Sequence, residues 1–307
     1  MNNNPLVSVI IPNYNHALYL EERLHSVLNQ TYQNFEVIIL DDNSTDNSLE
    51  IIKKYKKDPH ISNVIVNEMN SGSPFKQWQK GFEIAKGELI WIAESDDSCD
   101  SSFLDDLVRC YQENTVLVFS RSRIIDENNG FHHYNPQDIF SASFVMNGKD
   151  FILEYLSFEN LIANASSAIF KKDTALCVNL EYTQKRYIGD WFFWIGILEM
   201  GDVAFVSKEH NYFRQHVLNT TKIGGIGGTG VIEHKQLIDY LVKKHYLTGF
   251  KKIKYLLFYI DRYTRVPYSS KIVKTKVMKI WDEFYFYRAV LPFYKVSRYL
   301  RKLCRDY

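Results

Sequence analysis

The first 120 residues alternate between short β-branched runs and helical patterns, and this alternation restricts the possible folds more than any other feature. Apolar runs typical of buried strands occur at 6–11, 35–40, 63–66, 88–93 and 115–120. The spacing of apolar residues between them predicts helices over 20–28, 48–57 and 74–86. Strand and helix repeated in this order predict an α/β fold, a mostly parallel sheet with helices on both faces.

Polar residues directly follow three of these expected strands, and they are Asn13, Asn15, Asp41, Asp42, Glu94, Ser95, Asp96 and Asp97. Any one of them is equally typical of a turn, because Asp and Asn are common in loops. Ligands of parallel sheets, however, bind at the carboxyl ends of the strands. Three carboxylates within the stretch WIAESDD also repel one another unless water, a cation or hydrogen-bond donors offset the repulsion. The three clusters together favour a nucleotide or metal site.

The charge of the chain is balanced overall but unevenly spread. The 37 basic residues against 36 acidic ones give no general attraction for nucleic acid. Residues 251–307, by contrast, contain 15 Lys and Arg against 4 Asp and Glu. This asymmetry predicts a basic C-terminal segment with a partner of its own.

Cysteine spacing and the apolar runs predict a cytoplasmic protein. The four cysteines show no CxxC spacing, and the N-terminal stretch MNNNPLVSVIIPNYN lacks the basic start and cleavage site of a signal peptide. No window approaches the roughly 18 uninterrupted apolar residues of a spanning helix. We therefore expect no transmembrane segment, while peripheral membrane contact stays open.

The alternation fades after about residue 125. We expect a loop over 127–138, strands at 165–170 and 202–207, and a buried helix over 187–201. The segment KIGGIGGTG at 222–230 contains five glycines, and no strand runs directly into it. It is more typical of a flexible substrate-covering loop than of a phosphate-binding turn. After about residue 235 the pattern is helical.

Four motifs in a fixed order resemble the family 2 glycosyltransferases of bacteria, which have the GT-A fold. They are PNYN after the first strand, DDNSTD after the second, AESDD after the fourth, and GDW near residue 190. The resemblance covers about residues 5–220. It implies inverting transfer of a sugar from a nucleotide-diphosphate sugar, expected to be a UDP-sugar, to a hydroxyl of a glycan or lipid-linked acceptor. The expected setting is synthesis of a bacterial surface polysaccharide.

The resemblance also implies a nucleotide-binding set, namely Pro12, Asn13, Tyr14, Asn15, Asp41, Asp42, Lys76, Glu94, Ser95 and Asp96. Asp42 is expected to pair with the base or its ribose, because an ionised acceptor makes strong hydrogen bonds. The alternative is that Asp42 caps the following helix, a role that suits Asp46 better. Lys76 is implied near the diphosphate, although a lysine on a helix is equally typical of a solvated face.

A divalent cation, Mn²⁺ or Mg²⁺, is implied as the cofactor. The resemblance assigns Asp96, Asp97 and His216 to it, with Asp97 either a direct ligand or a supporting residue. Hard oxygen ligands suit these cations, which usually take one or two carboxylates together with phosphates and water. Glu94 stands where relatives more usually have Asp. Arg214 is a candidate phosphate contact, and a single His such as His216 is also common as a core or surface residue.

Asp190 is implied as the general base that takes the proton of the acceptor hydroxyl. Relatives usually have Glu-Asp here, whereas this chain has Gly189 before Asp190. The alternative role of Asp190 is that of an N-cap, because Asp is common before an apolar helix.

We predict two domains. Residues 1–235 form the catalytic domain, with a nucleotide-binding half over 1–120 and an acceptor-binding half over 121–235, and residues 236–307 form a basic, aromatic-rich helical extension. Within it, 284–303 mixes aromatic and basic residues. That pattern suits either a helix on an anionic membrane surface or a helical cap on the catalytic domain.

Two other functions are compatible with such a fold. A nucleotidyltransferase would normally have a glycine-rich, basic segment after the first strand, and VSVIIPNYNHALYL has none. A catalytically silent sugar-binding protein is disfavoured by the presence of Asp42, Asp96 and Asp190, but the sequence alone leaves it open.

Overall fold

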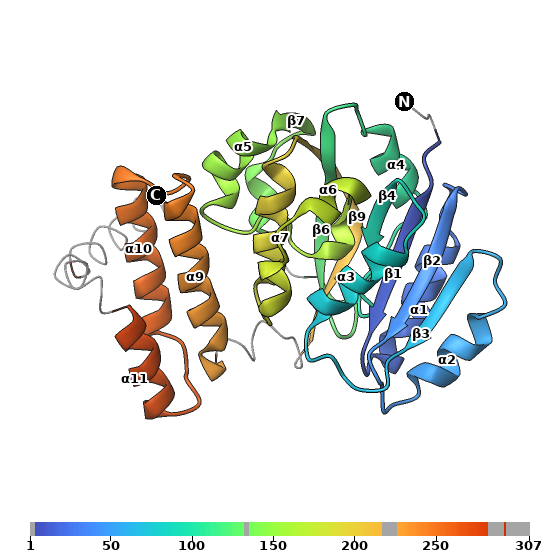
Figure 1. The fold of residues 1–307 in the computed structure, drawn as a ribbon, viewed down its shortest axis with the longest axis horizontal. Coiled ribbons are helices and arrows are strands. Elements are labelled where there is room, and N and C mark those ends of the chain that lie inside the picture. The colour runs from blue at the N-terminus through green and yellow to red at the C-terminus, as the bar shows by residue number, and fades with distance from the viewer. Residues whose placement is uncertain (1–3, 132–134, 217–225, 282–291, 293–307) are drawn as a thin grey trace. The chain divides into compact units, whose positions relative to one another are not determined.

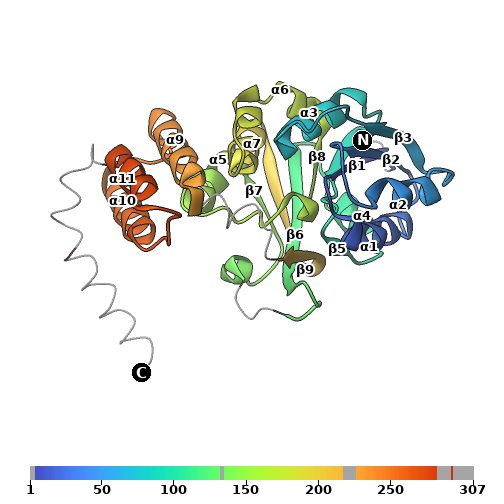
Figure 2. The ribbon, with the colours of Figure 1, turned by 90° about the horizontal axis from the view of Figure 1, so that it is seen from below.

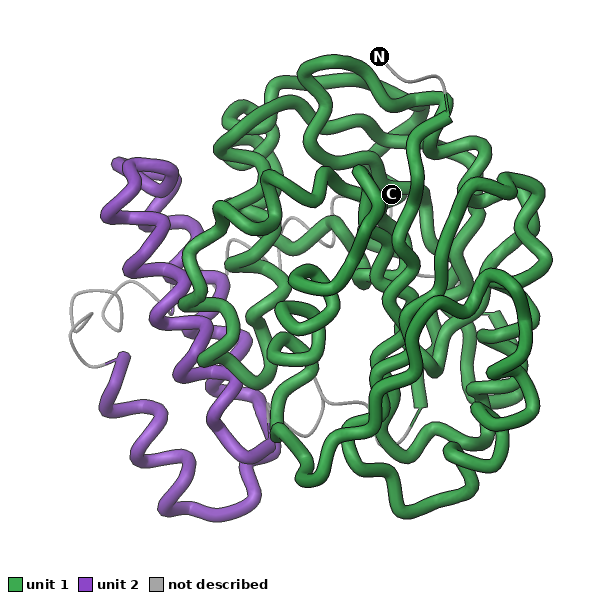
Figure 3. The backbone as a smooth tube through the Cα atoms, turned by 45° about the vertical axis from the view of Figure 1, so that its right-hand side comes forward, with its two compact units in different colours: residues 1–217 green, residues 218–307 purple. Residues whose placement is uncertain are grey.

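The computed structural model describes residues 4–131, 135–216, 226–281 and 292. The chain divides into two compact units, residues 1–217 and 218–307 (Figure 3). The predicted boundary at residue 235 falls inside a continuous helix, α9 (Thr229–Lys243).

The first unit contains a nine-stranded mixed sheet (Figure 1). Eight strands follow the order β3-β2-β1-β4-β8-β6-β9-β5, and β7 pairs with β9. Their bounds are β1 Val7–Asn13, β2 Phe35–Asp41, β3 Ile61–Val66, β4 Leu89–Ile92, β5 Ser98–Cys99, β6 Thr115–Asp126, β7 Phe144–Asn147, β8 Ala168–Lys171 and β9 Asp202–Gln215. The predicted α/β class is confirmed.

Strand direction changes across the sheet. Strands β1, β2, β3 and β4 are parallel neighbours, as the sequence predicts. Strand β8 then pairs antiparallel with both β4 and β6, so β4 and β6 are not neighbours. The sequence pattern identifies strands near 115–120 and 165–170 but not this insertion, because pairing partners are set by tertiary contacts.

Helices cover both faces of the sheet, as Figure 2 shows. Helices α1 (Ala17–Leu28), α2 (Ser48–Tyr55) and α4 (Phe103–Arg109) lie on one face. Helices α3 (Pro74–Ile84), α6 (Lys172–Cys177) and α7 (Gly189–Leu198) lie on the other. The short helix α5 (Gly148–Phe151) follows β7.

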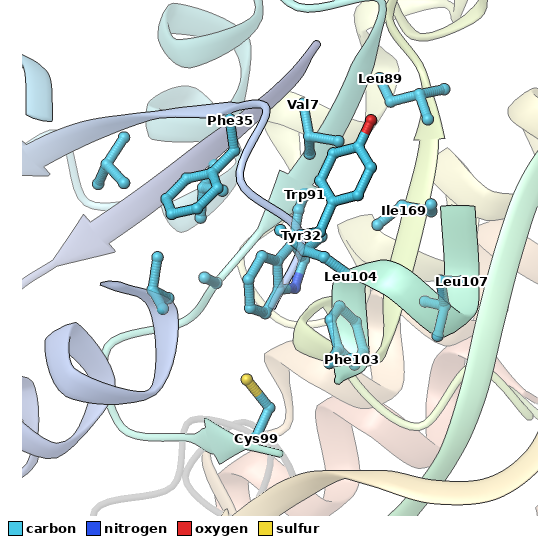
Figure 4. Close-up of a cluster of buried hydrophobic side chains, with 14 of the residues drawn as sticks. Val7, Tyr32, Phe35, Leu89, Trp91, Cys99, Phe103, Leu104, Leu107 and Ile169 are labelled. Atoms are coloured by element: carbon cyan, nitrogen blue, oxygen red, sulfur yellow. The ribbon is translucent and has the colours of Figure 1, made fainter. Parts of the chain in front are cut away.

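Alternate residues of β1 point to opposite faces, which divides the core into two layers. Val7, Val9 and Ile11 belong to the cluster that also holds apolar residues of α1, α2 and α4, and Figure 4 shows its centre around Trp91 and Phe103. On the other face α3 approaches β1 closely. A Cβ at Gly81 would lie 2.7 Å from the Ile10 side chain, so a larger residue at this crossing would force Ile10 to move.

Two strands extend well beyond their apolar runs. β6 continues to Asp126 and β9 to Gln215, and the two pair in parallel along this extension. Outside the apolar runs the residues are mostly polar, so hydrophobic periodicity misses them. The extension matters because it carries the chain at 214–216 to the turn that follows β4.

The second unit is helical where it is described, as predicted. Its helices are α9 (Thr229–Lys243), α10 (Gly249–Thr264) and α11 (Lys271–Ile280). In the predicted glycine-rich loop, residues 222–225 lie outside the described residues, while Gly228, with φ of 80°, precedes α9. The predicted helix over 284–303 also lies outside them, apart from residue 292.

Among the residues that the structure describes, no helix combines the length and the apolar character needed to cross a membrane.

His234 sits in the core of the second unit. Its ring nitrogens lie 2.9 Å from the Tyr255 hydroxyl and 2.7 Å from the Tyr263 hydroxyl. Burial, reinforced by the charge of Arg262, lowers the pKa of His234 to about 3. The imidazole is therefore neutral in the folded state over the ordinary pH range.

This pKa predicts an acid-sensitive stability. Below the unfolded-state pKa of about 6.5, the unfolded chain binds a proton that folded His234 does not. Stability should therefore fall by about 1.4 kcal/mol per pH unit from this residue as the pH drops from 6.5 toward 3. Urea unfolding at pH 7 and pH 5, followed by circular dichroism, should show a weaker pH dependence in His234→Gln. The control is His245→Gln, an exposed histidine of the same unit, which should leave the dependence unchanged.

Candidate functional site

The ends of β1 and β2 form one side of the candidate site. Asn13 and Asp41 are register partners, and Asn13 Nδ2 donates to Asp41 Oδ2 at 2.8 Å and to Ser44 Oγ at 3.1 Å. The other oxygen of Asp41 accepts from the Ser44 N–H at 2.8 Å. These bonds hold the two strand ends together and direct the Asp41 carboxylate inward.

The PNYN segment presents three different environments. Pro12 and Asn13 are buried in β1, and Asn13 Oδ1 has no hydrogen-bond partner among the described residues. Tyr14 is 45% exposed, which suits a ring that could stack on a ligand. Asn15 adopts a left-handed φ of 56°, and its side chain accepts from the Thr45 N–H.

Asp42 anchors the loop between β3 and α3. Its buried carboxylate accepts hydrogen bonds from Asn67 Nδ2, from the N–H and hydroxyl of Ser71, and from Gln77 Nε2. It does not cap α2. Asp46 instead accepts hydrogen bonds from the first residues of two helices. They are the Ser48 N–H of α2 at 2.9 Å and the Ala17 N–H of α1 at 2.9 Å. The role of Asp42 in nucleotide binding stays a prediction.

Lys76 lies exposed in the first turn of α3. Its Nζ donates to the Ser71 carbonyl at 3.1 Å, within the loop that Asp42 anchors. The position leaves the ammonium at the surface next to this loop. Its expected contact with a diphosphate stays a prediction.

The three carboxylates of the turn after β4 have different environments. Glu94 accepts from Trp78 Nε1 at 2.9 Å, and burial together with the charge of Asp96 raises its pKa to about 8. Burial and the charge of Asp96 also raise the pKa of Asp97. Burial alone would raise the pKa of Asp96 as well, but the His216 hydrogen bond and the charges of His16 and His216 outweigh it and lower that pKa. Asp96 is thus the carboxylate that ionises most readily.

Asp97 is turned away from the surface. Its Oδ2 accepts from Asn164 Nδ2 and from Ser166 Oγ, and its Oδ1 accepts from the Arg214 N–H at 2.9 Å. The guanidinium of Arg23 lies 4.0 Å from Oδ2. The carboxylate therefore ties the turn to the β8 side of the sheet and to the end of β9.

Three side chains form a group able to bind a metal ion. Ligand atoms of His16, Asp96 and His216 all lie within 4.8 Å of one another. His216 Nε2 is 3.1 Å from Asp96 Oδ2, and the two imidazole centroids are 5.8 Å apart. Asp97, which the sequence places with the metal ligands, does not belong to this group. Ser95 borders it, with its hydroxyl 2.8 Å from His16 Nδ1.

Arg214 is a buried structural residue rather than an open phosphate contact. Its guanidinium donates to the Asp96 carbonyl at 2.9 Å, to Asn129 Oδ1 at 2.6 Å and to Glu22 Oε2 at 2.8 Å. It also lies over the Tyr19 ring, 4.9 Å from its centroid. These contacts occupy the guanidinium and stabilise the turn that follows β4.

Asp190 lies in the first turn of α7. The N-cap of α7 is Ile188, so the alternative of Asp190 as N-cap is wrong. Its Oδ2 accepts from Asn160 Nδ2 at 2.9 Å, and its negative charge is favourable near a helix N-terminus. Asp190 is partly exposed, as a residue that meets a substrate must be.

Side chains of helix α3 contact both the start of α7, where Asp190 lies, and the turn after β4, which contains Glu94. A Cβ at Gly189 would lie 2.5 Å from the Phe75 ring and 2.6 Å from the Tyr182 carbonyl, so this chain has no room for the Glu that relatives usually carry. The Phe75 ring packs edge-on against Trp78 at 5.0 Å, and Trp78 donates to Glu94. The packing around Gly189 therefore leaves no space for a side chain before Asp190.

Sequence reasoning missed two residues of the site. His16 immediately follows PNYN and precedes α1, and its position next to that motif was the available signal. Asn160 lies in an irregular segment with no recognisable motif. Only the folded chain brings it to Asp190.

Comparison with known proteins identifies the family. The model of glycosyl transferase family 2 matches residues 8–172, more than half of the chain. The chain therefore belongs to glycosyltransferase family 2. This agrees with the resemblance carried by the four motifs.

Several curated bacterial proteins are similar to this chain. Glycosyltransferase GlyG of Streptococcus pneumoniae is 34% identical over 158 residues, which cover 51% of this chain and 49% of GlyG. A Campylobacter jejuni GalNAc(5)-diNAcBac-PP-undecaprenol beta-1,3-glucosyltransferase is 26% identical over 193 residues, 63% of this chain and 60% of that protein. The matches thus span about half to three fifths of these relatives.

Solved structures show the same fold. Staphylococcus aureus TarS residues 1–349 in complex with UDP aligns with a TM-score of 0.60 at 20% identity, covering 95% of this chain and 91% of that one. Pyrobaculum calidifontis mannosyltransferase PcManGT, solved with GDP-Man and Mn²⁺, aligns with a TM-score of 0.52 at 18% identity, covering 78% and 64%. The predicted GT-A architecture is confirmed.

The tight packing at Gly189 predicts a destabilising substitution. Gly189→Ala places a Cβ against Phe75 and the Tyr182 backbone, and overpacking of this kind costs about 1–3 kcal/mol. Urea unfolding should report that loss. Gly227→Ala is the control, because a Cβ at Gly227 would have no neighbouring atom within 4 Å, and an equal loss there would contradict the steric explanation.

The unequal environments of Asp96 and Asp97 predict unequal effects on stability. Asp97→Ala leaves three donors and the Arg23 charge without their acceptor, which should lower the free energy of unfolding by about 3 kcal/mol. Asp96→Ala removes mainly the His216 contact and should cost less than about 1 kcal/mol. Thermal and urea unfolding of both variants without added metal will test this order. Equal losses would show that Asp97 has no special structural role.

Proposed function

We propose that this chain is an inverting glycosyltransferase. It transfers a sugar from a UDP-sugar to a hydroxyl of a glycan or lipid-linked acceptor, in the synthesis of a bacterial cell-surface polysaccharide. The observation that carries the proposal is the metal-capable group at the carboxyl ends of β1, β4 and β9, in a chain of this family. That is where ligands of open α/β sheets bind.

The donor proposal has support from similar proteins. TarS residues 1–349 align equally well in the complexes with UDP and with UDP-GlcNAc, at TM-scores of 0.60, while the GDP-Man complex of PcManGT aligns at 0.52. Curated relatives include a poly(ribitol-phosphate) beta-glucosyltransferase of Bacillus spizizenii and a putative teichuronic acid biosynthesis glycosyltransferase of Bacillus subtilis. The ligands of the TarS complexes favour a UDP-sugar donor, and the names of the two Bacillus relatives favour a cell-surface product.

In this proposal the nucleotide lies across the ends of β1 and β2. The exposed ring of Tyr14 suits a nucleobase, because a base offers a flat face. Asn13 Oδ1 is a buried acceptor without a partner among the described residues, and it could accept from a base N–H if the base reaches this edge. Pro12, Asn15, Asp41 and Asp42 shape this edge, with Asp42 keeping its loop in place. Lys76, Glu94 and Ser95 would lie toward the diphosphate.

The residues present fit a divalent cation. Asp96 and His216 would hold it directly, and we assign Asp97 as a positioning residue instead of a ligand, because internal donors already occupy its carboxylate. When bound, Mn²⁺ or Mg²⁺ offsets the negative charge that develops on the departing diphosphate. Asp96 has the ionised carboxylate that such a site requires.

Asp190 would act as the general base. The acceptor oxygen forms its bond to the anomeric carbon while the bond to the UDP oxygen breaks on the opposite face, and Asp190 takes the hydroxyl proton. One displacement of this kind inverts the anomeric configuration without a covalent intermediate, as in the inverting class of glycoside hydrolysis. Asn160 holds the carboxylate through its 2.9 Å hydrogen bond.

The proposal also assigns a function to each part of the chain. Residues 1–120 would bind the nucleotide, 121–235 the acceptor, and 236–307 would form an extension. The exposed lysines of α11, Lys271, Lys274, Lys276 and Lys279, add to the basic character of 251–307. Contact of this segment with the anionic inner face of the cell membrane would bring the enzyme to a lipid-linked acceptor.

Asp190→Asn should slow transfer strongly and leave donor binding intact. The amide cannot accept the acceptor proton, so the rate should fall by about 10²–10⁴-fold. UDP release from a panel of UDP-sugars measures transfer, and calorimetric titration of UDP with Mn²⁺ measures binding.

The matched control is Asp173→Asn, an exposed carboxylate in the first turn of α6, which should keep full activity. If Asp190→Asn transfers sugar at the wild-type rate, Asp190 is not the base. If the wild-type chain binds none of UDP, GDP and CMP, with or without Mn²⁺, the proposal of a nucleotide-sugar transferase fails.

A further inference from the structure

We propose that His16 is a third protein ligand of the cation site, so that the site binds Mn²⁺, Co²⁺ or Zn²⁺ without nucleotide and prefers these ions to Mg²⁺. The inference deepens the proposed function and rests on it for the use of the cation. The ligand set and the preference follow from the residues themselves.

The three side chains come from separate parts of the chain and converge on one point. His16 precedes α1, Asp96 follows β4, and His216 follows β9. Their ligand atoms lie within 4.8 Å of one another, which leaves room for one ion among them. The two imidazole rings are nearly perpendicular, at 87°, and each lies next to the Tyr19 ring.

Neighbouring contacts hold each of these residues in place. The Ser95 hydroxyl is 2.8 Å from His16 Nδ1, and Asp46 accepts from the Ala17 N–H directly after His16. Arg214, two residues before His216, donates its backbone N–H to Asp97 and its Nε–H to the Asp96 carbonyl. Metal sites depend on such supporting bonds, because they orient the ligands before the ion arrives.

The donor set determines the preferred cation. Mg²⁺ favours oxygen ligands and keeps several of its waters, so imidazole nitrogens are poor ligands for it. Imidazole suits Zn²⁺ and related transition ions, and affinity for such sites rises from Mn²⁺ to Co²⁺. Two imidazoles with one carboxylate therefore favour a transition ion. Diphosphate oxygens and water would fill the remaining positions.

The number of protein ligands determines when the cation binds. A site with a single carboxylate depends on substrate phosphates to hold its ion. Three protein ligands provide half of an octahedral coordination shell by themselves. The free protein should therefore bind the ion first and present it to the incoming nucleotide.

The test is metal binding by the full-length, metal-stripped protein without any nucleotide. Calorimetric titration with Mn²⁺, Co²⁺ and Mg²⁺, together with the visible absorption of bound Co²⁺, gives the affinity and the presence of nitrogen ligands. We expect one Co²⁺ or Mn²⁺ per chain, bound at least tenfold more tightly than Mg²⁺. His16→Gln should weaken binding by about tenfold or more and change the Co²⁺ spectrum.

The matched control is His25→Gln, an exposed histidine in the last turn of α1, the helix that follows His16, and this variant should bind these ions as the wild type does. Wild-type protein that binds Mg²⁺ as tightly as Co²⁺ would overturn the proposal, and this result does not depend on any variant folding. Unchanged Co²⁺ affinity in folded His16→Gln would also overturn it. A protein that binds Co²⁺ through His16 but transfers no sugar would refute the proposed function alone.

Discussion

The buried carboxylate of Asp97 is the interaction on which the site most depends. It lies between β4 and β5 and accepts from Asn164, from Ser166 and from the backbone N–H of Arg214. These partners come from segments far apart in the sequence, and the two oxygens of a carboxylate can accept from several donors at once. Because Arg214 is held in this way, the end of β9 stays beside the turn that follows β4.

This arrangement explains how the protein accommodates three carboxylates in four residues. Asp97 is surrounded by internal donors, and the partly buried Glu94 accepts from Trp78 and has a pKa raised to about 8. Both groups have a raised pKa, which lowers the repulsion around Asp96. Asp96 alone faces the two histidines, and their contacts lower its pKa. One carboxylate is therefore ready for a cation, while its neighbours support the turn.

Much of the fold could be predicted because its signals are local. The apolar runs predicted the bounds of β1 to β4 to within two residues. Because ligands bind at the carboxyl ends of parallel strands, the polar residues that follow these strands could also be assigned to one edge of the sheet. The insertion of β8 between β4 and β6 could not be predicted, because strand order depends on contacts between distant segments. The sequence pattern did not predict the polar extension of β9 for a related reason. This extension is held by hydrogen bonds to β6 and has no run of apolar residues that would indicate a strand.

The sequence by itself determined the family, the α/β class and the chemical groups at the strand ends, because motifs, periodicity and residue type can be read along a single segment. Only the tertiary structure decided which groups act together. It separated Asp97 from Asp96, which are adjacent in the chain, and joined Asp96 to His216, which is 120 residues away. It also brought His16 to the same point. Side-chain direction and strand pairing set these contacts, and both depend on packing across the whole sheet.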